Sequence, residues 1–347
     1  MKQGNKYGTH RVIEPKGALP QTAYKISNDM EIFDNEIRIN VDSLNIDSAS
    51  FTQLKEEAKN DPEKIKKKIL SIVKERGKMQ NPVTGSGGML LGTVEKIGDA
   101  LLGKIDLKVG DRIATLVSLS LTPLKIDEIV NIKIEIDRVD IKGKAILFES
   151  GIYSKLPEDM DDSLALAALD VAGAPAQTAK LVKSGDSVFI LGATGKSGIL
   201  CSYEARKRVG PTGKVIGLAR NSERADDLKK IGYCHDVVIA DARDATAILD
   251  QILSLNKGKE VDISINCLNI AECEMSSILP VRNGGIVYFF SMATSFTRAA
   301  LGAEGIGKDV LMIIGNGYTK DHAEITLEEL RESKKLRQLF EQKYVNA

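Results

Sequence analysis

Between Ser184 and Gly317, short apolar runs rich in β-branched residues alternate with stretches whose apolar residues recur at helical spacing. Continuous apolar runs of this length are typical of strands buried on both faces of a parallel sheet. An alternation of strands and helices indicates a doubly wound α/β domain, which we predict over residues 156–317. The strands are expected at residues 187–191, 214–218, 236–240, 261–267, 285–291 and 310–314.

The pattern before this domain is different. Residues 31–40, EIFDNEIRIN, alternate apolar and polar positions as a half-buried strand does, and residues 117–148 hold further short runs rich in Ile and Val. Helical spacing covers residues 51–75. We therefore predict a strand-rich domain over residues 1–155 that begins with an extended arm. A last segment, residues 318–347, carries a charged amphipathic helix.

Three glycines, Gly192, Gly195 and Gly198, lie between the first predicted strand of the α/β domain and the helical stretch that follows it. In a Rossmann dinucleotide site, glycines at this turn let the backbone approach the pyrophosphate, which the amides of the helix N-terminus bind. An ordinary tight turn with three unrelated glycines is the alternative, but the strand that follows the helix favours the dinucleotide site. The loop residues expected to bind the cofactor are Gly192, Thr194, Gly195, Lys196, Ser197 and Gly198.

Arg220 follows the second predicted strand, where NAD-selective sites usually carry an acidic residue for the ribose 2′-OH. Ser222 and Arg224 come directly after it, and arginine forms a two-pronged, charge-assisted contact with a phosphate. The segment favours NADP as the cofactor, with NAD as the alternative if Arg220 stacks on the adenine. Asn266 and Ser291 end later strands, at the edge where open α/β sheets bind ligands, and are expected to contact the nicotinamide or its ribose.

The composition limits the functional classes. The 48 basic residues balance the 48 acidic residues, so no basic excess indicates a nucleic-acid partner. No apolar run is long enough to span a bilayer and the first residues lack the apolar core of a signal peptide, so we expect a cytoplasmic protein without a membrane partner. The four cysteines form no CxxC pair and the three histidines are far apart, which is not a metal-ligand spacing.

Several segments resemble the medium-chain dehydrogenase/reductase superfamily and occur in its order. INVDSLNIDSASF resembles its early strand and active-site loop, and GSGGMLLGTVEKIGDALLGKIDLKVGDRI its glycine loop, strand and GDR turn. ALAALDVAGAPAQTA resembles the helix before the cofactor domain, and VLMIIGNG the strand that leads back to the catalytic domain. The resemblance implies a GroES-like β-barrel domain at residues 1–155 beside a Rossmann domain, with the active site in the cleft. It also implies a return of residues 318–347 to the first domain and a homodimer.

The arm YGTHRVIEPKGALP, the LNIDS segment and the GATGKSG loop resemble more closely the family of L-erythro-3,5-diaminohexanoate dehydrogenases of bacterial lysine fermentation. This resemblance, over nearly the full length, implies hydride transfer from a small diamino acid to NADP or NAD. The product would be 5-amino-3-oxohexanoate, with release of ammonia. Two alternatives remain open. One is a zinc-free quinone or enone reductase of the same superfamily, and the other is a non-catalytic NADP-binding sensor.

The chain departs from the zinc-dependent members of the superfamily at their ligand positions. These positions fall at or beside Asp47, residues 85–88 and Asp170, so the Cys-His set is missing and we expect a zinc-free site. The resemblance brings both acids to the active site, where a carboxylate binds the substrate ammonium and accepts its proton. A loop carboxylate bonding its own backbone is the alternative for Asp47, and a solvent-facing helix residue is the alternative for Asp170. The catalytic candidates are Asp170, Asp47, Ser86 and Thr84, the last two as groups that orient water or substrate.

Overall fold

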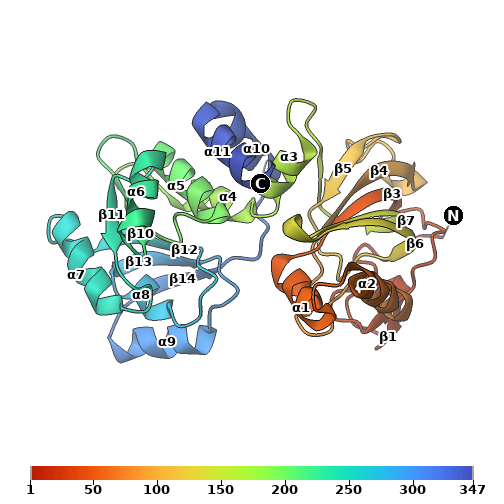
Figure 1. Cartoon of the computed structure of the whole chain (residues 1–347), viewed down its shortest axis with the longest axis horizontal. Helices are drawn as coiled ribbons and strands as arrows, with labels where there is room; N and C mark the ends of the chain where they lie inside the picture. The colour runs from red at the N-terminus through yellow and green to blue at the C-terminus, as the bar shows by residue number, and fades with distance from the viewer. Residues whose placement is uncertain (1, 346–347) are drawn as a thin grey trace. The chain divides into compact units, whose positions relative to one another are not determined.

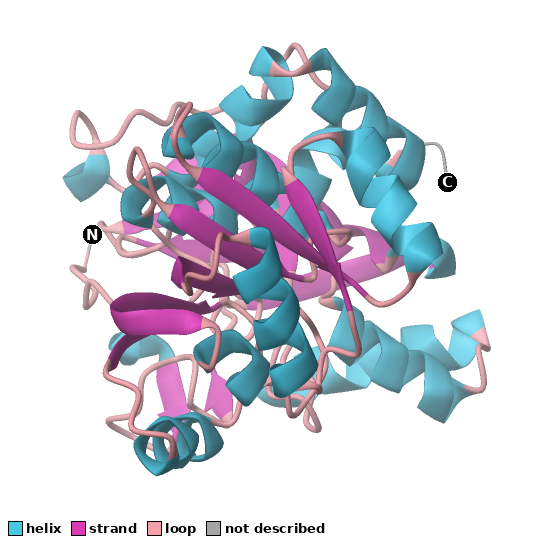
Figure 2. Cartoon of the chain, turned by 90° about the vertical axis from the view of Figure 1, so that its left-hand side faces the viewer, coloured by secondary structure: helices cyan, strands magenta, loops and turns pink. Residues whose placement is uncertain are grey.

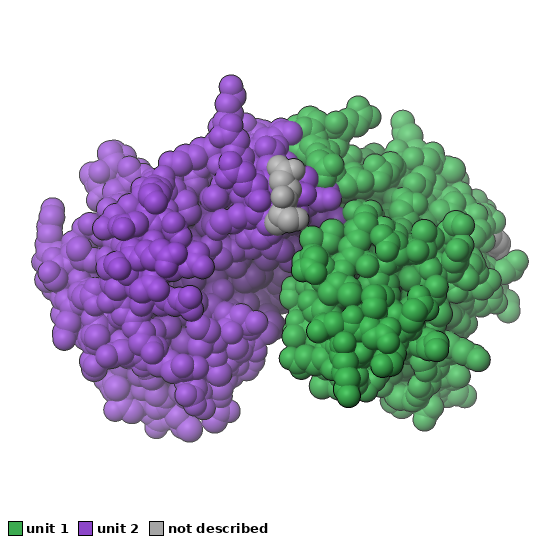
Figure 3. Space-filling view, viewed as in Figure 1, with its two compact units in different colours: residues 1–162 green, residues 163–347 purple. Residues whose placement is uncertain are grey.

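The computed structural model describes residues 2–345 and consists of two compact units, residues 1–162 and residues 163–347 (Figure 3). Each unit contains its own six-stranded sheet and its own hydrophobic core. No helix in this described part of the chain is long and apolar enough to cross a membrane.

The second unit is built on a parallel sheet with the strand order β11-β10-β9-β12-β13-β14 (Figure 1). Its strands are β9 (Ser187–Leu191), β10 (Lys214–Ala219), β11 (Asp236–Ile239), β12 (Val261–Asn266), β13 (Val281–Phe289) and β14 (Val310–Ile314). All the predicted strands are present, and the predicted fold class is confirmed. The central strand β9 is buried at every residue, which explains its unbroken apolar sequence.

The start of β13 differs from the prediction. This strand begins at Val281, whereas the apolar pattern predicted a start at residue 285. The pairing of β12 with β13 shifts register between Val261 and Ile263, and Gly284 has a φ of 71°. The intervening polar residues of β13 occupy this irregularity, so the strand begins before its apolar run does.

Helices cover both faces of the parallel sheet (Figure 2). Apolar residues of α4, α5 and α6 are buried in the core on one face, and those of α7, α8 and α9 in the core on the other. The helices are α3 (Asp162–Leu169), α4 (Gly173–Leu181), α5 (Lys196–Val209), α6 (Ser222–Ile231), α7 (Ala245–Leu255), α8 (Glu274–Ile278) and α9 (Phe296–Gly305).

The order of the strands creates one switch point in this sheet. From β9 the chain moves outward through β10 to β11, and then returns to the opposite side of β9 with β12. The loops that leave the carboxyl ends of β9 and β12 therefore run in opposite directions. Open α/β sheets bind ligands in the crevice at such a point.

Two helices follow the sheet, α10 (His322–Glu332) and α11 (Lys334–Tyr344). The resemblance implied that residues 318–347 return to the first domain, but α10 packs on α4 and α5 of the second unit. Its buried apolar stripe includes Ala323, Leu327 and Leu330. Polar contacts reinforce the packing, since Glu332 binds the Nζ of Lys207 on α5 at 2.8 Å.

The first unit contains an antiparallel sheet with the strand order β6-β7-β3-β4-β5-β8. Its strands are β3 (Glu36–Asn45), β4 (Met89–Ile97), β5 (Arg112–Thr115), β6 (Leu124–Lys133), β7 (Arg138–Phe148) and β8 (Tyr153–Lys155). The other elements are β1 (Val12–Glu14), β2 (Lys25–Ile26), α1 (Ser48–Ala58), α2 (Pro62–Arg76) and the 3₁₀ turns η1 (Thr9–Arg11), η2 (Asp99–Leu101) and η3 (Ile134–Ile136). Apolar residues of α1 and α2 join those of the sheet in one core.

A buried ion pair fastens the N-terminal arm to this sheet. The Arg11 guanidinium donates two hydrogen bonds of 2.6 Å to the carboxylate of Glu36, and both side chains are almost fully buried. Burial alone would raise the pKa of Glu36, but the hydrogen bonds from Arg11 and from the N–H of Phe33 lower it overall. Because the pair is bidentate, it fixes the direction of the arm as well as its position.

Two further buried carboxyl groups lie between α5 and α10. Glu204 on α5 and Glu329 on α10 are both fully buried. Glu204 binds Lys207 and Arg208, whereas neither carboxyl oxygen of Glu329 has a hydrogen-bond partner among the described residues. Burial, and then the neighbouring charge of Glu204, raise the pKa of Glu329 well above its ordinary value. Glu329 thus remains protonated at pH values that ionise an exposed glutamate.

Replacing Glu329 with Gln keeps the size of the side chain and removes its titration. Because the pKa is higher in the folded state, the wild type should lose stability relative to Glu329→Gln as the pH rises from about 4.3 toward the raised folded value. The expected slope is about 1.4 kcal/mol per pH unit within this window. Urea unfolding at a series of pH values measures it. Glu328→Gln, at an exposed position on the same helix, is the control. Parallel curves for the wild type and Glu329→Gln would contradict the prediction.

Candidate functional site

The glycine loop joins the end of β9 to the start of α5. Gly192 has a φ of 81°, a left-handed conformation that suits glycine, and its carbonyl accepts the N–H of Gly195 at 2.9 Å. Gly195 is the N-cap residue of α5 and no side chain caps this end of the helix. The first amides of α5 therefore point out of the helix without a side-chain acceptor, which is the arrangement that binds a pyrophosphate.

The three glycines have different reasons to be glycine. A Cβ on Gly198 would lie 2.1 Å from the carbonyl oxygen of Gly192, so this residue lets the helix pack against the end of the strand. A Cβ on Gly192 would meet the backbone of Cys267 at 3.0 Å. On Gly195 the nearest atom would be 3.3 Å away, and the residue is exposed. That atom is the carbonyl oxygen of Gly192 and no other lies within 4 Å, so the exposed side of Gly195 fits a bound dinucleotide.

A cavity of about 630 Å³ lies beside this loop, at the carboxyl ends of β9, β10, β11 and β12. It is bounded by backbone and small apolar residues from the strand ends, and by charged side chains from the loops after β10 and β11 and from the first turn of α6. Its lining consists of Gly192, Thr194, Leu218, Ala219, Arg220, Arg224, Ala240, Asp241, Ala242, Arg243, Leu268 and Ile270. The cavity therefore occupies the switch point of the sheet, next to the helix end that would bind a pyrophosphate.

Three arginines surround the cavity. Within residues 2–345, the guanidinium of Arg220 makes no hydrogen bond or ion pair with another residue. Arg224 lies 3.4 Å from Asp227, one turn further along α6, and Arg243 donates to the carbonyl of Ala271 at 3.3 Å. Ser222, predicted as a cofactor contact, begins α6 but does not line the cavity. The unpaired guanidinium of Arg220 leaves positive charge available to an anionic ligand.

Arg243 and Asp241 were missed by the sequence analysis. Both follow β11, and Asp241 accepts the N–H of Arg243 at 2.9 Å. The signal was available, because the predicted strand at residues 236–240 ends directly before them. The ligand positions predicted from strand ends lay at or after the ends of the strands at residues 187–191, 214–218, 261–267 and 285–291 but not of this one.

Asn266 and Ser291, at the ends of β12 and β13, lie side by side. The backbone N–H of Ser291 donates to the carbonyl of Asn266 at 3.1 Å. The buried side chain of Asn266 donates to Ser277 Oγ at 3.0 Å and accepts the N–H of Leu268 at 3.0 Å. Ser291 Oγ accepts the N–H of Ala293 at 3.2 Å. Both side chains therefore hold the turns that follow their strands.

Asp170 directly follows α3 and forms an ion pair with Lys196, the first residue of α5. Its Oδ2 lies 2.9 Å from the Lys196 Nζ. This contact explains an acidic residue within an otherwise apolar stretch, and it ties a predicted catalytic residue to the glycine loop. Ser197, the next residue of that loop, is buried at the start of α5.

The other predicted catalytic residues meet in the first unit. Asp47 is the N-cap of α1, where its Oδ1 accepts the N–H of Ser50 at 3.0 Å. This is the local backbone contact considered as the alternative for Asp47, yet its Oδ2 is buried without a partner in the described chain. The hydroxyls of Ser50 and Thr84 lie 2.5 Å apart, and the N–H of Ser86 donates to Thr84 Oγ1 at 3.3 Å. We call Asp47, Ser50, Thr84 and Ser86 the hydroxyl cluster.

Buried Asn81 positions this hydroxyl cluster. Its Oδ1 accepts the N–H groups of Val83 and Thr84 at 2.8 and 3.2 Å, and its Nδ2 donates to the carbonyl of Ser50 at 3.2 Å. Neither Asn81 nor Ser50 was predicted as a site residue. An Asn before Pro and an Asp three residues before Ser at a helix start were the available signals.

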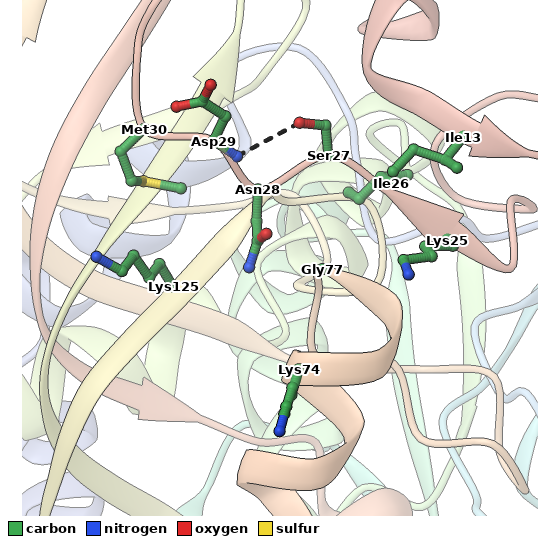
Figure 4. A pocket seen from close by; sticks show the side chains of 10 residues that line it. All are labelled: Ile13, Lys25, Ile26, Ser27, Asn28, Asp29, Met30, Lys74, Gly77 and Lys125. Atoms are coloured by element: carbon green, nitrogen blue, oxygen red, sulfur yellow. Dashed lines mark hydrogen bonds between the residues drawn. The ribbon is translucent and has the colours of Figure 1, made fainter.

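Another pocket in the first unit contains no predicted site residue. It has a volume of about 580 Å³ and is lined by Ile13, Lys25, Ile26, Ser27, Asn28, Asp29, Met30, Lys74, Gly77 and Lys125 (Figure 4). Its lysine side chains extend in different directions instead of meeting at one point. The described residues also contain no group of three or more His, Cys, Asp or Glu side chains arranged to hold a metal ion.

The fold and the glycine loop define the class of the protein. Among solved structures, 2-haloacrylate reductase is similar over 97% of this chain and 95% of its own, with a TM-score of 0.57 and 16% sequence identity. At this level of identity the similarity is one of fold. The chain therefore shares the fold of this reductase, with a Rossmann-type parallel sheet and a glycine loop in one unit and an antiparallel sheet in the other.

Sequence comparison narrows this class to a single family. A protein of Acetoanaerobium sticklandii named L-erythro-3,5-diaminohexanoate dehydrogenase is 71% identical, over 99% of this chain and 100% of its own length. A protein of Fusobacterium nucleatum with the same name is 70% identical over the same shares. The family model for the L-erythro-3,5-diaminohexanoate dehydrogenase N-terminal domain matches residues 10–157. The chain belongs to the L-erythro-3,5-diaminohexanoate dehydrogenase family, which confirms the resemblance in its sequence.

Alanine substitutions at two loop glycines should separate folding from cofactor binding. Gly198→Ala should destabilise the protein by about 1–3 kcal/mol, because its Cβ collides with the Gly192 carbonyl. Gly195→Ala should lose less stability than Gly198→Ala, because its Cβ would lie 3.3 Å and not 2.1 Å from the Gly192 carbonyl oxygen. It should bind dinucleotide at least about tenfold more weakly, since the new methyl group occupies the ligand's space. Thermal melting and a fluorescence titration with NADPH and NADH measure both effects. If Gly195→Ala bound both dinucleotides normally, this loop would not be the pyrophosphate site.

Proposed function

We propose that this protein catalyses the NAD(P)-dependent oxidative deamination of L-erythro-3,5-diaminohexanoate to 5-amino-3-oxohexanoate, with release of ammonia. The observation that carries the proposal is the full-length identity of about 70% to two proteins with the corresponding name. The open space before Gly195 and the uncapped start of α5 support it, because the reaction requires a bound dinucleotide.

The chemistry demands a proton acceptor on the protein. When bound, the nicotinamide accepts the hydride from the carbon that carries the amine. The substrate nitrogen has to lose a proton before this carbon can become an imine, and an ammonium needs a negative group to hold it. Water then hydrolyses the imine, which supplies the oxygen of the ketone and releases ammonia. We propose that the Asp170 carboxylate accepts this proton. We further propose that Asp47 is a second carboxylate that binds an ammonium group. Thr84 and Ser86 supply hydroxyl groups that orient substrate or water.

A direct assay tests the activity. Purified protein is mixed with L-erythro-3,5-diaminohexanoate and either NADP or NAD, and the absorbance of the reduced nicotinamide and the released ammonia are followed together. We expect both products to appear in equal amounts. Reduction of the cofactor without ammonia would indicate oxidation at another group. Dinucleotide binding without turnover would favour a sensor, and turnover of quinones or enones alone would favour a reductase.

We propose NADP as the preferred cofactor. The support is the exposed and unpaired Arg220 directly after β10, where an acid would favour NAD. Arg220→Ala should weaken NADP binding about tenfold or more, since a charge-assisted hydrogen bond contributes about 1.5–3 kcal/mol, and should change NAD binding little. Titration of both cofactors measures this, with Arg206→Ala, an exposed residue at the far end of α5, as the control. A wild-type preference for NAD with equal losses in the mutant would assign Arg220 to adenine stacking.

Asp170→Asn keeps the shape of the side chain and removes its charge, so it tests the proton acceptor. The turnover number should fall by at least about 10²-fold, the usual scale for a general base. Steady-state kinetics at saturating substrate and cofactor measure it. Asp250→Asn, at an exposed position on α7, is the matched control and should retain the turnover of the wild type. A normal turnover number for Asp170→Asn would remove this residue from the chemistry.

A further inference from the structure

The Lys196 ammonium has neighbours from two other parts of the second unit. It belongs to the first residue of α5, lies 2.9 Å from Asp170 Oδ2, and sits over the ring of Tyr344 from α11 at 5.3 Å from the ring centroid. The side chains of Lys196 and Asp170 are 28% and 33% exposed. The pair is thus partly shielded but open to an approaching ligand.

The position of this lysine on its helix is electrostatically unfavourable. The N-terminus of a helix carries partial positive charge, so it attracts anions and repels cations. No side-chain cap offsets this charge at α5, because Gly195 has none to offer. Within the described chain, Asp170 is the acid that forms an ion pair with Lys196. Asp170 therefore balances both the ammonium and the helix end.

A dinucleotide pyrophosphate would supply negative charge at the same place. The open side of Gly195 and the uncapped amides of α5 fit such a group. An ammonium has several N–H donors and a flexible stem, so Lys196 can turn from a carboxylate toward a phosphate without movement of the backbone. We propose that Lys196 is a positioning residue that exchanges Asp170 for the cofactor pyrophosphate, so that dinucleotide binding releases the Asp170 carboxylate.

The exchange implies that the cofactor binds before Asp170 can bind the substrate ammonium. While Lys196 holds Asp170, the carboxylate is neutralised and is a poor partner for a substrate ammonium. Once the cofactor is bound, the carboxylate becomes available to the ammonium and to its proton. This consequence rests on the proposed function, whereas the exchange between the two anions does not. The exchange therefore has its own test, in which no substrate is used.

The test is a double-mutant cycle on dinucleotide binding, measured by fluorescence titration with NADPH and, in parallel, NADH. Lys196→Met should weaken binding about tenfold, since it removes a charge-assisted contact. Asp170→Asn should tighten binding about two- to fivefold, the range of an exposed ion pair, because Lys196 no longer has a competing anion. In the Lys196→Met background, Asp170→Asn should have no further effect. Lys196→Arg should bind nearly as the wild type does.

Two controls keep the cycle interpretable. Thermal melting verifies that each variant is folded, and Lys180→Met, an exposed lysine on α4, should leave the affinity unchanged. Weaker binding by Asp170→Asn, or the same effect of this substitution with and without Lys196, would overturn the exchange. A protein that fails to oxidise 3,5-diaminohexanoate but shows the full cycle would refute the proposed function alone. An active protein with independent effects would refute the exchange alone.

Discussion

The contact between Gly198 and Gly192 is the constraint on which the second unit depends. Because Gly198 has no side chain, the first turn of α5 lies directly against the carbonyl that ends β9. This contact fixes where α5 starts and directs its free amides toward the switch point of the sheet. It also positions the rest of α5, on which α4 and α10 pack. A single missing methyl group thus sets both the ligand-binding end of the helix and the packing along its length.

The strands of the second unit could be predicted because burial on both faces of a sheet requires an unbroken apolar run. A strand such as β9 is buried on both faces and has to be apolar throughout, so its limits appear directly in the sequence. β13 shows where this logic fails, since its first residues are polar in an irregular register. The position of α10 failed for a different reason. A short apolar stripe indicates that a helix packs against another surface, but it does not identify that surface. Here α10 packs against α4 and α5.

In the candidate site, the glycine loop could be predicted from the sequence but the side-chain contacts could not. The glycine loop was recognised because backbone geometry restricts the residue type at each position. Side-chain partners carry no such restriction. The contact of Asp170 with Lys196 joins residues 26 positions apart, and the contact of Ser50 with Thr84 joins residues 34 apart. Neither pairing follows from local spacing, which explains why Asp170, Lys196 and Thr84 were predicted as site residues but the pairings themselves, and the residue Ser50, were not.

Charge is distributed unequally around the loop, and this has a physical meaning. Arg220 lines the cavity and has no hydrogen-bond or ion-pair partner among residues 2–345, whereas Lys196 is already bound to Asp170. An unpaired exposed arginine costs little because water solvates it, and its full charge is available to a ligand. A paired lysine has to break its ion pair with the carboxylate before it binds a ligand. Part of the binding free energy is therefore spent on separating the pair. Such a pair weakens cofactor affinity. This loss is offset only if the released carboxylate then binds the substrate ammonium or accepts its proton. Under the proposed exchange, the ion pair at the glycine loop links cofactor binding to the availability of the Asp170 carboxylate.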